Sequence, residues 1–147
     1  MTLIGASERR PDSFTVLVCR GCCCGTAGKH PDVPHGEHLR RINDAIATLS
    51  EPRSRVRVTD CLGPCRHSNV VVVRPHRRGR PGDRDAVWLG EMLTQAAIDT
   101  LTAWIRAGGP SRCRLPPSLE AHMFDPRTPS SPSADEPIAF LSTRPKR

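Results

Sequence analysis

The chain has 147 residues, 37% of them hydrophobic and 3% aromatic, which predicts one small domain with tails and excludes a large enzyme core with a deep cavity. Its 22 Lys and Arg against 15 Asp and Glu give a net charge of +7, which favours acidic partners. No stretch is apolar enough to span a membrane, and residues 1–13 lack the apolar region of a signal peptide, so we expect a cytoplasmic protein. In that compartment the seven cysteines favour metal or redox chemistry over structural disulfides.

The first half of the chain predicts a strand, a loop and a helix. Residues 14–18 are rich in β-formers and predict a first strand that leads directly into Cys19. An irregular loop rich in Gly, Cys and Pro follows as far as Pro34. Apolar residues then recur every three or four positions, which predicts a helix that ends at Glu51-Pro52; they are Leu39, Ile42, Ile46 and Leu49.

The second half predicts three strands and another helix. Residues 55–59 alternate in polarity, and residues 69–74 contain four consecutive valines, typical of a central strand buried on both faces. Residues 86–89 predict a short fourth strand. Thr94 can cap a final helix that stops at Gly108-Gly109-Pro110, and its apolar positions are Ile98, Leu101, Trp104 and Ile105.

The order β-α-β-β-β-α predicts an α/β fold in which helices pack on a mixed sheet. The first β-α-β unit should be right-handed with parallel strands, so the loops after its two strands should meet at one edge of the sheet. We therefore expect a domain over residues 14–109, with a flexible N-terminus at 1–13 and a Pro/Ser-rich, mostly disordered tail at 110–147. Within that tail, residues 119–124 either fold back on the domain or form an exposed interaction motif.

Thiols follow both of these strands. Cys61 and Cys65 lie on a tight loop whose Gly63 and Pro64 restrict the backbone. The first strand is followed by four cysteines, at positions 19, 22, 23 and 24. Because the two loops share an edge, we expect their thiols to converge on one inorganic centre, and one pairing gives Cys19-x4-Cys24 with Cys61-x3-Cys65.

These residues resemble the thioredoxin-like 2Fe–2S ferredoxins, a family that includes free bacterial ferredoxins and the small 2Fe–2S subunit of respiratory complex I. The family has one cysteine ending the first strand, a second in the next loop, and a Cys-Leu-Gly-x-Cys loop after the second strand, as at residues 61–65 here. The resemblance extends over about residues 14–109, to the final helix. The chain departs from the family at Ser68-Asn69, where the family usually has Gly-Pro.

The resemblance implies a thioredoxin-like fold, a 2Fe–2S cluster, and one-electron transfer by a carrier rather than catalysis by an enzyme. It implies four ligands, Cys19, Cys24, Cys61 and Cys65. The family's spacing favours Cys24 over Cys22 and Cys23 as the second of them. A homodimer is a further implication of the family.

Two other functions stay open. Cys19-Arg20-Gly21-Cys22 is a Cys-x-x-Cys after a strand, typical of a thiol–disulfide oxidoreductase in which Cys19 attacks and Cys22 resolves. Against it, helical periodicity resumes only at Leu39, so Cys19 lacks the helix N-terminus that would lower its pKa. Four cysteines at these spacings also suit a structural zinc site in an interaction module.

The segment from Arg74 to Arg84 contains five arginines, both ends included, interleaved with Gly and Pro. It predicts an exposed basic loop. We expect it either to keep a surface turn soluble or to dock an acidic redox partner. Interleaved aromatic residues and a recognition helix are both absent, which argues against a nucleic-acid partner.

Overall fold

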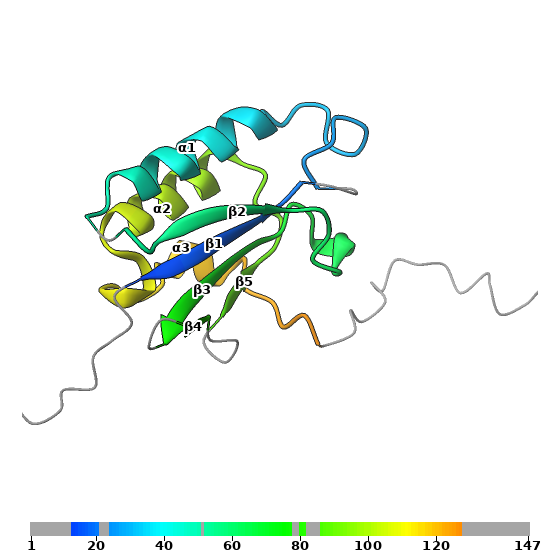
Figure 1. Cartoon of the computed structure of the whole chain (residues 1–147). Helices are drawn as coiled ribbons and strands as arrows, with labels where there is room; N and C mark the ends of the chain where they lie inside the picture. Colours follow the sequence, from blue (N-terminus) through cyan, green and yellow to red (C-terminus); the bar gives the residue numbers. More distant parts are fainter. Residues whose placement is uncertain (1–12, 21–23, 51, 78–79, 82–85, 128–147) are drawn as a thin grey trace, which may run out of the picture.

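The structure, a computed structural model, describes residues 13–20, 24–50, 52–77, 80–81 and 86–127. In these residues the chain forms a mixed α/β domain, as the sequence predicts (Figure 1). The main sheet has the order β2-β1-β3-β5, with β1 (Phe14–Cys19), β2 (Arg55–Thr59), β3 (Val71–Arg77) and β5 (Val87–Leu89). The described helices are α1 (His35–Ala47), α2 (Gln95–Arg106) and the one-turn α3 (Pro117–Glu120), and none is long and apolar enough to cross a membrane.

The two faces of the sheet are covered differently. One face packs against α1, α2 and α3 around a core that contains Val16, Val73 and Ile98. The opposite face carries a smaller apolar cluster that contains Leu17, Cys19 and Cys24, without a helix among the described elements that pack on it. Since side chains alternate along a strand, β1 contributes Val16 and Val18 to the first core and Leu17 and Cys19 to the second cluster.

Strand β1 pairs in parallel with β2 and antiparallel with β3, so the connection through α1 is a parallel crossover, as expected from the β-α-β order. The register places Cys19 opposite Thr59 at the ends of β1 and β2. The loops that follow these two strands therefore leave the sheet side by side. This juxtaposition positions the candidate site.

Both long helices begin close to where the sequence predicts. Thr94 caps α2 by accepting a hydrogen bond from the N–H of Ala97 at 3.2 Å, and the helix is followed by Gly108 in the left-handed region at φ 113°. Helix α1 ends at Ala47, four residues before the expected Glu51-Pro52, because the chain turns there so that Leu49 can pack against the core.

Strand β3 is longer than the sequence predicts, since it continues from the expected end at Arg74 to Arg77. Pro75 does not interrupt it because its nitrogen faces the β5 side of β3, beyond the last described pair, Val73 with Val87. The strand then turns back into β4 (Arg80–Pro81), which pairs with Arg77 and His76. The expected basic loop therefore begins as a hairpin, and residues 78–79 and 82–85 of it lie outside the described residues.

The domain does not end at residue 109. A 3-10 turn at Gly109–Ser111 leads to α3, whose Leu119 is fully buried in the main core. The chain then forms a β-bridge between Met123 and Leu89, with the Phe124 N–H donating to the Trp88 carbonyl at 3.1 Å. The described part of the expected tail is thus packed on the sheet, and residues 128–147 lie outside the described residues.

We expect Leu119→Ala to lower the free energy of unfolding by about 2–5 kcal/mol, because it empties a site inside a packed core. Denaturant unfolding of the full chain measures this, with exposed Glu120→Ala in the same helix as the matched control. Equal stability of the two variants would show that residues after 109 do not belong to the folded domain.

Candidate metal centre

The loops after β1 and β2 contact each other through backbone and sulfur. The Arg20 N–H donates to the Thr59 carbonyl at 2.9 Å, which extends the parallel ladder by one residue. The Cys19 thiol donates to the Asp60 carbonyl at 3.7 Å, within the range of sulfur hydrogen bonds. Cys19 therefore lies against the residue that immediately precedes Cys61.

Cys19 and Cys24 lie together as thiols at the edge of the second cluster. Cys19 is 2% exposed and Cys24 is 1% exposed, and the Cys24 thiol hydrogen-bonds with Cys19. Burial raises the pKa of Cys24 to about 11; a backbone hydrogen bond from Val70 opposes the shift, and the neighbouring Cys19 adds to it. The structure thus brings together the two residues that the family's spacing pairs.

The second thiol loop is more open. Cys61 is exposed, and its sulfur accepts a hydrogen bond from the N–H of Gly63 at 3.3 Å. Gly63 has φ 103°, a conformation that favours glycine and that turns its N–H back towards the sulfur. Hydrogen bonds of this kind from backbone N–H groups to sulfur are found around iron–sulfur clusters and tune their potential.

Cys65 begins a 3-10 turn at Cys65–His67, but the position of its side chain lies outside what the structure describes, as do Cys22 and Cys23. Among the described side chains, no three His, Cys, Asp or Glu residues gather closely enough to hold a metal ion. The described part of the expected ligand set is therefore a buried pair, Cys19 and Cys24, and the exposed Cys61, which does not gather with them into a three-residue group.

A polar network missed by the sequence analysis holds the first thiol loop in place. Asn69 is fully buried, its side-chain carbonyl accepts the N–H of Gly25 at 2.9 Å, and its amide donates to His35 Nδ1 at 2.9 Å. His35 Nε2 then donates to the carbonyl of His30 at 3.1 Å, and His30 Nε2 contacts the hydroxyl of Ser68 at 3.1 Å. The Ser68-Asn69 pair, where the sequence departs from the family pattern, lies just before β3. Its side chains thus connect the first thiol loop and α1 to this position by hydrogen bonds.

Arg20 and His38 lie behind the thiols. Burial lowers the pKa of Arg20, while the nearby sulfurs of Cys24 and Cys19 oppose this shift. Burial also lowers the pKa of His38, with Arg20 and His35 acting in the same direction, so this ring is held neutral. Arg20 remains the positive charge beside the sulfurs, and a guanidinium in that position favours their anionic form.

The C-terminal segment packs against His67, at the end of the 3-10 turn that begins at Cys65. The ring of Phe124 stacks on His67 with centroids 4.0 Å apart and meets Trp88 edge-on at 6.1 Å. Gly90 permits this approach, because a Cβ at that position would lie 2.8 Å from the His67 Cβ and 3.1 Å from the Phe124 ring. Two residues after Cys65, His67 is therefore packed under an aromatic ring.

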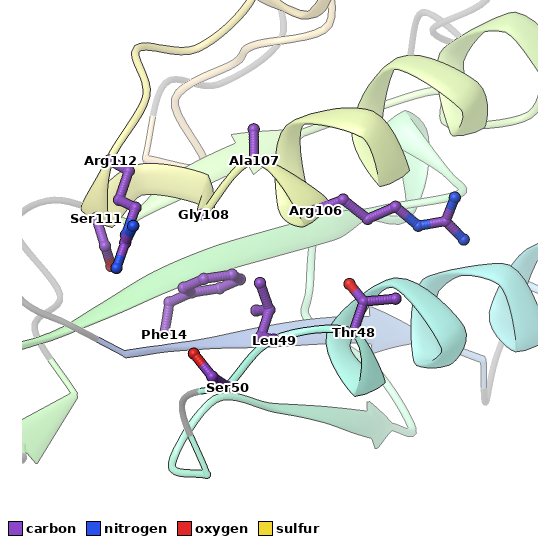
Figure 2. A pocket seen from close by; sticks show the side chains of 9 residues that line it. All are labelled: Phe14, Thr48, Leu49, Ser50, Arg106, Ala107, Gly108, Ser111 and Arg112. Carbon is purple, nitrogen blue, oxygen red and sulfur yellow. The ribbon is translucent and has the colours of Figure 1, made fainter.

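A cavity of about 510 Å³ lies away from the thiols, at the other end of the sheet (Figure 2). Its walls include Phe14 at the start of β1, whereas Cys19 is at the end of that strand. Figure 2 shows the Phe14 ring and Leu49 between the ends of the two helices, with Arg106 extending away from them. No cysteine lines this cavity, so it is separate from the predicted thiol centre.

Comparisons with protein-family models, with curated proteins and with solved structures found no match to this chain. The chemistry that the site can support is therefore inferred from the positions and surroundings of its residues. Two buried thiols in contact, a third thiol with an N–H aimed at it, and an adjacent guanidinium form an environment suited to binding a thiophilic metal or cluster.

We expect the metal-free protein to react with iodoacetamide first at Cys61, because this thiol is exposed, and far more slowly at Cys24. At pH 8 a thiol of pKa about 11 is ionised in about one molecule in a thousand, so alkylation of Cys24 should accelerate steeply as the pH rises towards 11. Mass spectrometry of the labelled peptides measures both rates. Equal rates for the two cysteines at pH 8 would contradict the described burial.

We expect Asn69→Ala to lower the free energy of unfolding by about 1–3 kcal/mol, because it leaves the Gly25 N–H and His35 without their buried partner. The same change should accelerate alkylation of Cys24 by loosening its loop. Asn43→Ala is the matched control, since Asn43 makes an exposed side-chain bond to Leu39 within α1. Unchanged Cys24 reactivity in Asn69→Ala would show that the network does not hold the thiol loop.

Proposed function

We propose that this protein is a 2Fe–2S electron carrier with a thioredoxin-like fold, its cluster held by Cys19, Cys24, Cys61 and Cys65. The observation that carries the proposal is the contact between the Cys19 and Cys24 thiols beside the loop that bears Cys61. A 2Fe–2S cluster takes two thiolates on each iron, and two cysteine pairs on adjacent loops would supply them.

The chemistry of the donor set supports the proposal. All the proposed ligands are thiols, the ligand class that these clusters take, and the Gly63 N–H already points at one sulfur. When bound, the cluster supplies a one-electron redox couple. The chain would supply the positive charge of Arg20. It would also supply the apolar surroundings of Leu17, Val70 and Val72, against which Phe124 packs.

A thiol–disulfide oxidoreductase is the second candidate, and the contact between Cys19 and Cys24 bears on it. A disulfide between these two sulfurs would form by loss of two protons and two electrons, whereas the alternative partner, Cys22, lies outside the described residues. The raised pKa of Cys24 works against this function at neutral pH, because the thiolate is the form that attacks. A zinc-stabilised interaction module is the third candidate and uses the same four thiols.

The proposal also includes the compartment, the oligomeric state and the partner of the protein. A carrier of this kind would work in the cytoplasm, as a homodimer, and would exchange electrons with an acidic redox partner. The chain's net charge of +7 supports an acidic partner, with the segment Arg74–Arg84 as one contact.

We expect anaerobically purified protein to contain two irons and two acid-labile sulfides per chain and to be reddish-brown, with a colour that bleaches on reduction. Each of the single changes Cys19→Ser, Cys24→Ser, Cys61→Ser and Cys65→Ser should lower the iron and sulfide content, because each removes a thiolate ligand. Cys113→Ser is the matched control, since Cys113 bonds the Ala107 carbonyl away from the two thiol loops.

Other results would decide between the remaining candidates. One zinc per chain without sulfide would establish the interaction module. Protein without metal but with a reversible disulfide from Cys19, either to Cys22 as the sequence predicts or to Cys24, would establish the oxidoreductase. Loss of cluster in Cys22→Ser or Cys23→Ser, with retention in Cys24→Ser, would move the second ligand to one of those residues.

A further inference from the structure

Strand β2 forms an edge of the sheet. On one side it pairs with β1 along its whole length, and on the other side no described strand pairs with it. Val58 in this strand is 55% exposed, more than any other large hydrophobic side chain in the described part of the chain. Three residues further along the chain, after Asp60, the thiol loop begins at Cys61.

The backbone groups on that edge can be assigned. The carbonyl of Thr59 accepts the Arg20 N–H, so Thr59 directs its backbone groups towards the β1 side. Because orientation alternates along a strand, Arg57 and Arg55 do the same, and Val56 and Val58 direct their N–H and carbonyl groups outwards. No backbone hydrogen bond to these outward groups is found among the described residues. The edge therefore presents two donors and two acceptors to an incoming strand.

The valine and arginine side chains of β2 lie on opposite faces of the sheet. Val56 packs on the main core beneath the helices. The exposed Arg55 and Arg57 lie on the opposite face, since they are paired in register with Thr15 and Leu17. A strand added at this edge would thus meet two guanidinium groups on one face and the exposed Val58 on the other.

We propose that β2 is a docking edge to which a partner protein adds an extended acidic segment as a further strand. Strand addition supplies affinity through main-chain hydrogen bonds and selectivity through alternate side chains. Carboxylates placed opposite Arg55 and Arg57 would make cross-strand pairs of opposite charge, which are stabilising. The chain's overall charge of +7 would further favour encounter with an acidic partner.

The same residues disfavour a second copy of this chain as the occupant. Twofold antiparallel pairings of β2 with itself that are centred on Val56 or on Arg57 set an arginine directly opposite an arginine. Like charges directly opposite destabilise a strand pair, so these registers are protected against self-association. The pairing centred on Val58 sets Arg57 opposite Thr59 and places no acidic group against the arginines. The occupant that this edge favours is therefore a different and negatively charged strand.

Docking here would bring the partner close to Cys61. The added strand would end beside the last residues of β2, which lead through Asp60 into the thiol loop. If the protein carries electrons, as proposed above, the edge would align the partner with the exposed side of the centre. The docking itself uses only β2 and does not require a cluster.

The test uses the full chain and two capped, fluorescently labelled peptides of about nine residues, one of alternating Thr and Glu and one of alternating Thr and Lys. We expect fluorescence anisotropy to show saturable binding of the Thr/Glu peptide and none of the Thr/Lys peptide. Val58→Pro removes one outward N–H without removing a bond to β1, and it should weaken binding about tenfold, the effect of one lost hydrogen bond and a distorted edge. Val58→Thr keeps that N–H and the β-branched shape and should bind like the unmodified chain.

Charge reversal provides a second variant that leaves the backbone intact. Arg55→Glu combined with Arg57→Glu should abolish binding of the Thr/Glu peptide and create binding of the Thr/Lys peptide. The double charge reversal tests the proposal even if Val58→Pro does not fold. Circular dichroism would show whether Val58→Pro is folded.

The proposal is overturned if neither peptide binds, if both bind equally, or if the charge reversal leaves the preference for Glu unchanged. Concentration-dependent dimers that Val58→Pro dissolves would likewise overturn it and identify a second copy as the occupant. Because peptide binding does not read iron or sulfide, its failure leaves the electron-carrier proposal standing. Absence of iron in the purified protein equally leaves the docking edge standing.

Discussion

The parallel pairing of β1 with β2 is the constraint on which the candidate site depends. It sets Cys19 opposite Thr59, so the loops that carry the thiols leave the sheet at the same edge. A parallel pair requires a long crossover, and α1 supplies it while burying its apolar stripe against the sheet. Without this pairing, the two thiol loops would not leave the sheet side by side.

Much of this arrangement follows from local patterns. The alternating and continuous apolar runs locate the main strands, the three- and four-residue spacing locates both long helices, and Thr94 marks the start of α2 as its cap. The neighbouring position of the two thiol loops follows from the parallel pairing of the two strands in a β-α-β unit. These features depend on short windows of sequence, and the structure confirms them.

Other features depend on contacts that no short window contains. Asn69 is an ordinary polar residue in sequence, but its buried amide joins Gly25 to His35 across 44 and 34 residues of chain. Leu119 belongs to the stretch 119–124, which the sequence predicts either to fold back on the domain or to form an exposed motif, and only its insertion into a core built from earlier residues decides between them. Gly90 ends a strand in sequence, whereas in the structure it permits the stack of Phe124 on His67. Tertiary packing decides each of these positions.

The two thiol loops differ in a way that bears on function. The pair after β1 is buried against Leu17 and Val70, which raises the cost of ionised sulfur there unless a cation or metal compensates it. The loop after β2 carries the exposed Cys61 and continues directly from an arginine-bearing edge with which no described strand pairs. A centre bound between them would have one side in an apolar, rigidly held environment and the other next to solvent and a docking surface. An electron carrier requires this asymmetry, because its protein must shield the redox group and still bring one side of it within reach of a partner.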